Sequence, residues 1–351
     1  MLYSLLLLNL VCTVIPLLSI KKEIGLKISI TVLFIFLALR YNFGNDYMAY
    51  YMSFNDMTFE DRANTDVEIG YNLLCCAFRP LGFFTMIFCW SIFYCFSLYY
   101  AIRRYVEPQY YWLVMLCLIS NADLVFFGAS AVRQTLAFSC ILIAIPFLEK
   151  KNWLLYCVLV LLASTFHQSS IVFLFLYPLM YLDLQNKKFI LFFGLVAIGL
   201  MTVFKGQFES VIQVITMSNF EKYAERYGDS EATLGGGIAG TVVRVVFMLL
   251  FLWCMRKEED KIKSIFYILS VLCIVIFTFR NQVMLQRYTM YFGYMMSFAF
   301  AYVLKYVKGQ KNSLMYFAVL FLTLFWNINM AFSFALQSKS LFEYHTIFEV
   351  L

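Results

Sequence analysis

Two arginines stand where an apolar chain rarely places a permanent charge. Arg133 lies several residues into one apolar run, and Arg244 lies similarly deep in another. A cation in such surroundings costs several kcal/mol, so a partner or a function is expected for it. The guanidinium group is always charged, and its planar fork matches a phosphate or a carboxylate. These positions therefore predict a site for a strongly anionic ligand.

Two further residues could accept a proton. His167 is one of only two histidines, and it precedes Gln168, Ser169 and Ser170. An imidazole can act as a general base near neutral pH, but the same side chain could instead cap a turn. Asp46 is the second candidate base.

Aromatic residues follow Asp46 at a spacing that suits a helix. Tyr47 and Tyr50 are the first of them. Such side chains pack against sugar rings, and they also form the interfacial belt of membrane proteins. Both interpretations stay open from the sequence.

Several common kinds of site are not predicted. The sequence contains no Walker loop, GxGxxG, HExxH or GxSxG pattern. Its ten cysteines include no CxxC or metal-ligand spacing. We therefore expect no metal and no cofactor. The net charge of +6 does not indicate a nucleic-acid partner, because its meaning depends on where the charges lie around a membrane.

The elements that must position these residues are predicted to be membrane helices. Of the 351 residues, 63% are hydrophobic and only 14% are charged, and the mean hydropathy is +0.78. A soluble domain is nearer half apolar and a quarter charged. We expect an all-α polytopic membrane protein with about 12 transmembrane helices (range roughly 10–14) and no soluble domain.

The expected spans are 2–20, 24–40, 81–102, 109–127, 129–148, 152–166, 169–183, 189–205, 238–255, 262–279, 288–305 and 313–333. The segment 152–183 must cross twice, so each arm is only about 22 Å long. That is short for a hydrocarbon core of roughly 30 Å. The turn that carries His167 is therefore expected in a cavity below the outer surface.

Charge sets the expected orientation. Basic residues fall on every second connection, and those connections are predicted to be cytoplasmic. They hold 13 Lys and 3 Arg, whereas the other side holds 3 Lys and 8 Arg. We expect one integral membrane domain over 1–351, with long outer loops at 41–80 and 205–237 and a tail at 334–351. Interfacial or re-entrant helices are expected in the first loop.

The outer arginines are expected to differ in role. Arg62 and Arg226 suit contacts with headgroups or carboxylates. Five others lie at span ends or within apolar runs, and we expect them to converge on one outward-facing cavity for a pyrophosphate: Arg40, Arg133, Arg244, Arg280 and Arg287.

Four places in the sequence carry a resemblance to a known family. They are Leu39-Arg40-Tyr41-Asn42-Phe43-Gly44-Asn45-Asp46-Tyr47 with Tyr50, Glu68-Ile69-Gly70-Tyr71, Val132-Arg133-Gln134-Thr135-Leu136-Ala137 with Phe166-His167-Gln168-Ser169-Ser170, and Arg287-Tyr288. In these places the chain resembles the EpsG family of bacterial polysaccharide polymerases, which is related in role to the Wzy O-antigen polymerases. Residues 205–237 carry no motif of that family.

The resemblance implies polymerisation at the outer face of the bacterial cytoplasmic (inner) membrane by metal-independent glycosyl transfer. Oligosaccharide repeat units would arrive there on undecaprenyl pyrophosphate. His167, Asp46 and Arg133 would then be catalytic. The expected binding residues are Arg40, Arg244, Arg280, Arg287, Gln134, Tyr47, Tyr50 and Tyr288. Expected partners are the lipid-linked oligosaccharide and the bilayer, with a chain-length regulator and a flippase as further candidates.

Three other functions remain open. A flippase or exporter of the same lipid should carry ionisable residues into the inner half of its spans, whereas the embedded arginines here are expected in the outer half. An O-acetyltransferase would need a cytoplasmic route for its acyl donor. An O-antigen ligase has nearly the same chemistry as a polymerase, and the sequence does not separate the two.

Overall fold

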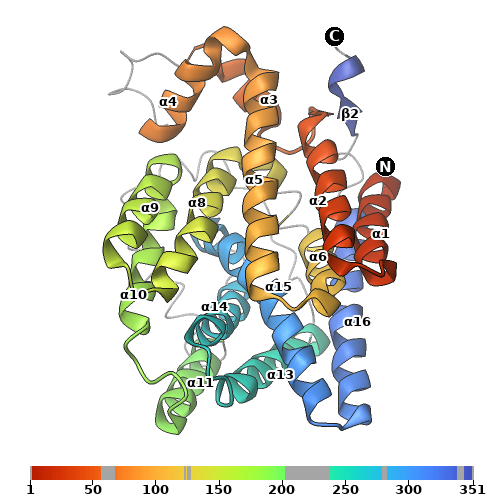
Figure 1. Cartoon of the computed structure of the whole chain (residues 1–351), viewed down its shortest axis with the longest axis vertical. Coiled ribbons are helices and arrows are strands. Elements are labelled where there is room, and N and C mark those ends of the chain that lie inside the picture. The colour runs from red at the N-terminus through yellow and green to blue at the C-terminus, as the bar shows by residue number, and fades with distance from the viewer. Residues whose placement is uncertain are drawn as a thin grey trace. The chain divides into compact units, whose positions relative to one another are not determined.

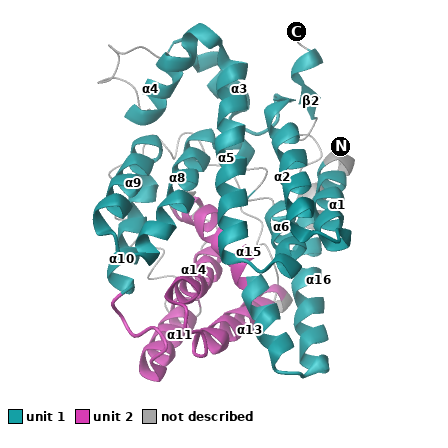
Figure 2. Cartoon of the chain, in the orientation of Figure 1, with its two compact units in different colours: residues 1–180, 300–351 teal, residues 181–299 magenta. Residues whose placement is uncertain are grey.

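The computed structural model describes residues 2–56, 68–121, 124, 128–201, 238–278, 283–337 and 344–349. These residues are mainly helical, with one short pair of strands (Figure 1). The chain forms two compact units, Met1–Met180 with Phe300–Leu351, and Tyr181–Ala299 (Figure 2). The prediction of a single membrane domain and the bounds of its loops and tail stay predictions.

The first unit begins with a helical hairpin. Helices α1 (Leu2–Leu18) and α2 (Lys22–Ala38) are joined by a hydrogen bond from Ser29 Oγ to the Cys12 carbonyl, at 3.0 Å. The short strand β1 (Arg40–Tyr41) follows. The hairpin brings the chain to the end of the unit at which the next two helices lie.

Two short helices occupy the segment that links the hairpin to a long helix. They are α3 (Tyr47–Ser53) and α4 (Ile69–Phe78), and the 3-10 helix η2 (Arg79–Leu81) leads from them into α5 (Phe83–Tyr105). Both short helices lie at one end of α5 in Figure 1. Short helices were expected in this segment, and their position relative to a membrane stays a prediction.

The core of the first unit is built on α5 and α8. After η3 (Pro108–Tyr110) and α6 (Tyr111–Ser120), α8 (Val132–Glu149) packs against α5, and Trp90 Nε1 donates to Thr135 Oγ1 at 3.0 Å. Helix α9 (Trp153–Phe166) lies beside α8 (Figure 1). Asn152 caps α9 by accepting a hydrogen bond from the backbone N–H of Leu155.

The expected seventh span, 169–183, differs from the prediction. Its residues form the 3-10 helix η4 (Gln168–Phe175) and the four-residue helix α10 (Leu176–Leu179) instead of one α-helix. A 3-10 helix rises about 2.0 Å per residue, against 1.5 Å in an α-helix. The same short arm therefore covers more distance, which suits a segment too short for an ordinary span.

The C-terminal part of the chain returns to the first unit. Helix α15 (Val283–Gly309) crosses the boundary between the units in sequence, and α16 (Ser313–Gln337) follows. Strand β2 (His345–Thr346) then pairs antiparallel with β1, and η5 (Ile347–Glu349) comes after it. The sequence did not predict this pairing, because it joins residues about 300 positions apart.

Three complete helices lie in the described part of the second unit. They are α11 (Lys187–Met201), α13 (Ile238–Met255) and α14 (Lys261–Phe277), together with the first part of α15. Asp260 caps α14 by accepting from the backbone N–H groups of Ile262 and Lys263, at 2.9 and 3.3 Å.

Three helices within the described residues are long and apolar enough to cross a membrane. They are α5, α8 and residues Ser313–Ala331 of α16. Shorter apolar helices lie at Leu5–Leu18, Trp153–Phe166, Gln168–Leu179 and Gly240–Met255. These findings fit an all-α membrane protein but do not confirm twelve spans; the expected span 109–127, for example, contains the ten-residue α6.

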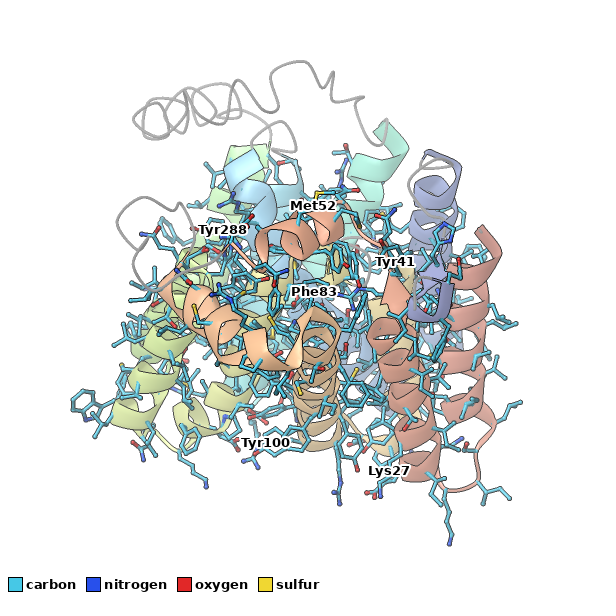
Figure 3. All side chains as sticks on the ribbon, turned by 90° about the horizontal axis from the view of Figure 1, so that it is seen from above. Lys27, Tyr41, Met52, Phe83, Tyr100 and Tyr288 are labelled. Atoms are coloured by element: carbon cyan, nitrogen blue, oxygen red, sulfur yellow. The ribbon has the colours of Figure 1, made fainter. Side chains whose placement is uncertain are left out.

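The two ends of the first unit differ in what they carry. Lys27 and Tyr100 lie toward one end, whereas Tyr41 and Met52 lie toward the other (Figure 3). Tyr41, Tyr51 and Phe83 belong to an aromatic cluster in which Tyr51 lies 6.2 Å from Tyr41 and 5.3 Å from Phe83, between ring centroids. The cluster fixes α3 against the start of α5.

Candidate functional site

The carboxylate of Glu68 joins two of the predicted catalytic residues. One of its oxygens lies 2.8 Å from Nδ1 of His167, and the other pairs with the guanidinium of Arg133. The exposed fractions of the side chains are 19% for Glu68, 10% for His167 and 27% for Arg133. We call these three residues and Tyr50 the Glu68 cluster.

A close backbone approach brings Glu68 to His167. Glu68 is the residue before α4, and His167 is the residue after α9. Gly70, in the first turn of α4, lies against the last turn of α9: a Cβ atom at this position would be 2.3 Å from Thr165 Oγ1 and 2.8 Å from the Thr165 carbonyl oxygen. Only glycine fits such a gap. The glycine therefore explains why the carboxylate can reach the imidazole.

A second close approach brings α3 to the start of α8. The backbone N–H of Asn45 donates to Ser130 Oγ at 2.8 Å, and Gly44, with φ of +108°, lies against the same serine. Tyr50, one turn into α3, then receives a hydrogen bond from Arg133 Nε at 3.4 Å. Three of the four motif segments noted in the sequence thus meet in one place in the first unit.

The surroundings of Glu68 keep it ionised. Burial acts to raise its pKa, but the hydrogen bond with His167 and the charge of Arg133 outweigh burial and lower that pKa to about 2. An ionised carboxylate can only accept hydrogen bonds, so His167 Nδ1 must be the donor. A neutral imidazole in this tautomer carries its lone pair on Nε2.

The second nitrogen of His167 is set up to accept a proton. Nε2 is buried and has no hydrogen-bond partner among the residues that the structure describes. A buried acceptor left without a partner costs about 1–3 kcal/mol. A carboxylate that accepts from Nδ1–H holds an imidazole in one tautomer and leaves Nε2 unprotonated. This is how a histidine that acts as a general base is commonly oriented.

Tyr50 is the uncharged member of the Glu68 cluster. Burial raises the pKa of its hydroxyl, which stays protonated at neutral pH. Its ring centroid lies 5.9 Å from the Arg133 guanidinium carbon. Tyr50 is thus a contact of Arg133, and it lies in the core instead of presenting a ring to solvent.

Arg40 and Tyr47 occupy a different environment. Arg40 is fully buried and donates to the carbonyls of Leu37 and Ala129, the latter at 3.1 Å. Its guanidinium carbon lies 4.5 Å from the ring centroid of Trp90, and Tyr47 donates to its backbone carbonyl at 3.0 Å. The guanidinium group stays charged at neutral pH even when it is buried. A pyrophosphate contact for Arg40 stays a prediction.

Asp46 and Gln134 lie beside the Glu68 cluster. Asp46 is exposed at the start of α3, and its charge acts on Tyr50. Gln134 is buried in the first turn of α8, next to Arg133. Their predicted roles, as second base and as substrate contact, stay predictions.

The remaining predicted residues belong to the second unit or lie outside the described residues. Arg244 is buried and donates within α13 to the Gly240 carbonyl at 3.2 Å and to Thr241 Oγ1 at 3.3 Å. Arg287 and Tyr288 are partly exposed in α15. Arg62, Arg226 and Arg280 lie outside the described residues. The convergence of five arginines on one cavity therefore stays a prediction.

Sequence reasoning missed Glu68 as a site residue. The signal was present, because Glu68 begins one of the four motif segments. Its partners, however, are 65 and 99 positions away along the chain, and no local pattern pairs residues at such separations.

Comparison with known protein families identifies the family of this chain. The model of the EpsG family matches residues 24–346, which is nearly the whole chain and includes every residue of the Glu68 cluster. Comparisons with curated proteins and with solved structures found no match. The chain therefore belongs to the EpsG family.

Proposed function

We propose that this protein is a polysaccharide polymerase that joins undecaprenyl-pyrophosphate-linked repeat units at the outer face of the bacterial cytoplasmic membrane. Membership of the EpsG family supports the general class, a polysaccharide polymerase-like membrane protein. One observation carries the catalytic assignment: Glu68 accepts a hydrogen bond from His167 Nδ1, and the buried Nε2 has no partner among the described residues.

The proposed reaction is a single displacement at an anomeric carbon. A hydroxyl of the acceptor sugar attacks that carbon, and its proton passes to His167 Nε2. The bond from the anomeric carbon to the pyrophosphate oxygen breaks, and the lipid pyrophosphate leaves with the bonding electron pair. Single displacement inverts the anomeric centre.

Glu68 has two tasks in this proposal. It fixes the tautomer of His167 before the reaction, and its negative charge stabilises the imidazolium that forms during it. The depressed pKa of about 2 means that the carboxylate does not take up the proton itself. Glu68 is therefore a positioning residue, and His167 is the base.

Arg133 holds Glu68 and retains donors for substrate. A guanidinium carries five N–H donors, and the contacts with Glu68 and Tyr50 account for two of them. The side chain is 27% exposed, so the remaining N–H donors can face an oxygen of the leaving pyrophosphate. Fixed positive charge at that position stabilises the transition state.

The first experiment uses a strain that lacks the gene. If the protein is a polymerase, single repeat units should accumulate on lipid in this strain and long polymer should be absent. Normal long-chain polymer would contradict the proposal, and loss of all outward-facing units would indicate a flippase instead.

The second experiment returns variants to that strain. His167→Ala should fail to restore long polymer while the protein inserts at normal abundance, and His345→Ala should restore it. Asp46→Ala tests the second candidate base. Loss of polymer with Asp46→Ala but not with His167→Ala would overturn the assignment of His167.

A further inference from the structure

Ser170 carries a buried hydroxyl group for which the described residues provide no hydrogen bond. Its side chain is fully buried, and its Oγ has no hydrogen-bond partner among the described residues. Alanine would fill nearly the same space without a polar atom. An unpaired buried hydroxyl costs about 1–3 kcal/mol, so the serine lowers stability unless something else uses it.

The other buried serines of the described chain behave differently. Each has a hydrogen bond to its side-chain oxygen, most often by donating to a carbonyl three or four residues earlier. Ser139 is typical, because its Oγ donates to the Thr135 carbonyl at 2.8 Å within α8. Ser120 and Ser130 instead accept, from Asn9 and from the backbone N–H of Asn45.

The local backbone explains why Ser170 lacks such a partner. His167 is extended, with φ of −154° and ψ of 113°, so the helical run of α9 stops just before it. The residue four positions before Ser170 is therefore on the far side of the break. The His167 carbonyl accepts from the backbone N–H of Ser170 at 3.0 Å.

Two buried polar atoms without partners thus come from one turn. His167 Nε2 and Ser170 Oγ belong to residues that a 3-10 hydrogen bond links directly. In the neutral imidazole with its proton on Nδ1, Nε2 is an acceptor, and the serine hydroxyl can donate. A ligand that satisfied both atoms would offer a hydroxyl proton to Nε2 and an oxygen acceptor to the serine hydroxyl.

We propose that Ser170 determines specificity for the acceptor by binding the oxygen next to the attacking hydroxyl. The ligand class is a vicinal diol of a neutral sugar ring: one hydroxyl donates to His167 Nε2, and the adjacent oxygen accepts from Ser170 Oγ–H. This inference rests on the proposed function and names the group that selects which hydroxyl reacts. A trapped water that serves only the fold is the alternative that the experiment must separate.

The test uses the full-length protein in lipid nanodiscs. The lipid-linked repeat unit, extracted from a strain that lacks the gene, is held at a fixed concentration. The repeat-unit oligosaccharide released from its lipid has no leaving group, so it serves only as acceptor, and its concentration is varied. Initial rates then give an acceptor KM and a kcat for each variant.

Ser170→Ala should raise the acceptor KM about 3- to 10-fold, with kcat changed less than about 2-fold, because one neutral hydrogen bond to substrate is lost. Its thermal midpoint should not fall, because the removed hydroxyl had no partner in the protein. Ser170→Cys, which keeps a weak donor, should give an intermediate KM. Ser139→Ala is the matched control and should leave KM unchanged.

The outcomes separate this inference from the proposed function. An unchanged acceptor KM in Ser170→Ala, beside an inactive His167→Ala, overturns the subsite alone. A lower thermal midpoint with unchanged KM identifies Ser170 as structural. If the wild-type protein forms no glycosidic bond from these substrates, both the function and the subsite are wrong.

Discussion

Both histidines of the chain bond a glutamate through Nδ1, and the two pairs differ in almost every other respect. The distance is 2.8 Å in His167–Glu68 and 2.7 Å in His345–Glu349. The first pair joins residues 99 positions apart and has exposed fractions of 10% and 19%. The second is a local contact four residues apart, with exposed fractions of 40% and 51%.

The comparison teaches that the bond itself does not mark a catalytic histidine. In the tail pair, hydrogen bonds from the Thr346 backbone and from His345 lower the pKa of Glu349, and both side chains are about half exposed. In the buried pair, the guanidinium of Arg133 is a further partner of the carboxylate, and Nε2 is cut off from solvent without a partner among the described residues. The His167–Glu68 pair therefore differs from the tail pair in its burial, in the guanidinium of Arg133 and in the unpartnered Nε2 of His167.

The largest expected effect comes from removing each imidazole in turn. His167→Ala should lower the rate of glycosidic bond formation about 100- to 10,000-fold, the usual contribution of a general base. His345→Ala should change it less than about 2-fold, because surface substitutions rarely reach the core. The rate is measured with purified protein and extracted lipid-linked repeat units. Similar losses in both variants would remove the distinction between the pairs.

Neutralising each glutamate should give the next largest difference. Glu68→Gln keeps an acceptor for Nδ1 but removes the charge that stabilises the imidazolium. Loss of a charge-assisted hydrogen bond of about 1.5–3 kcal/mol corresponds to a rate about 10- to 150-fold lower. Glu349→Gln should leave the rate unchanged in the same assay. A Glu68→Gln enzyme with full activity would show that the carboxylate is only structural.

A smaller effect should follow from moving α4 without touching the cluster. A methyl group in Gly70→Ala would meet Thr165, so α4 must shift and carry Glu68 away from His167. We expect unfolding to become easier by about 1–3 kcal/mol, together with a partial loss of rate. Gly309→Ala is the control, because a Cβ at Gly309 meets nothing within 4 Å. Equal rates in the two variants would contradict the role given to this contact.

The smallest expected effect is a pH dependence of stability. The pKa of Glu68 falls from an ordinary 4.5 to about 2 in the folded protein. Its contribution to stability is thus fully present above pH 4.5 and is lost as the pH falls toward 2. The difference in thermal midpoint between wild type and Glu68→Gln should shrink over that interval. For Glu349→Gln the difference should be smaller throughout, because exposed pairs contribute little. A constant difference for Glu68→Gln would contradict the depressed pKa.

The sequence predicted the parts of the site that a local pattern can reveal. Arg133 stood out as a charge in an apolar run, and His167 as a rare residue between two arms too short to be ordinary spans. Both lie in the Glu68 cluster. The family was predicted from the motif segments and is shown by the match over residues 24–346. Short helices before α5 were also expected, and α3 and α4 are present.

The parts that were missed depend on contacts between distant residues. Glu68 is unremarkable in its own segment and becomes central only when Gly70 lets α4 approach the end of α9. The contact between Tyr50 and Arg133 was also not predicted, because it depends on Asn45 and Ser130 fixing α3 at the start of α8, and the predicted sugar contact of Tyr50 stays a prediction. The pairing of β2 with β1 likewise joins distant residues, and no periodicity encodes it.

The most direct test of the central claim, that Glu68 acts through His167, is a double-mutant cycle on these two residues. Rates of glycosidic bond formation are measured for wild type, Glu68→Gln, His167→Ala and the double variant. If Glu68 acts only by orienting His167 and stabilising its positive charge, adding Glu68→Gln to His167→Ala should not lower the rate of glycosidic bond formation any further. If the two losses multiply instead, Glu68 acts independently of the imidazole and the account is wrong.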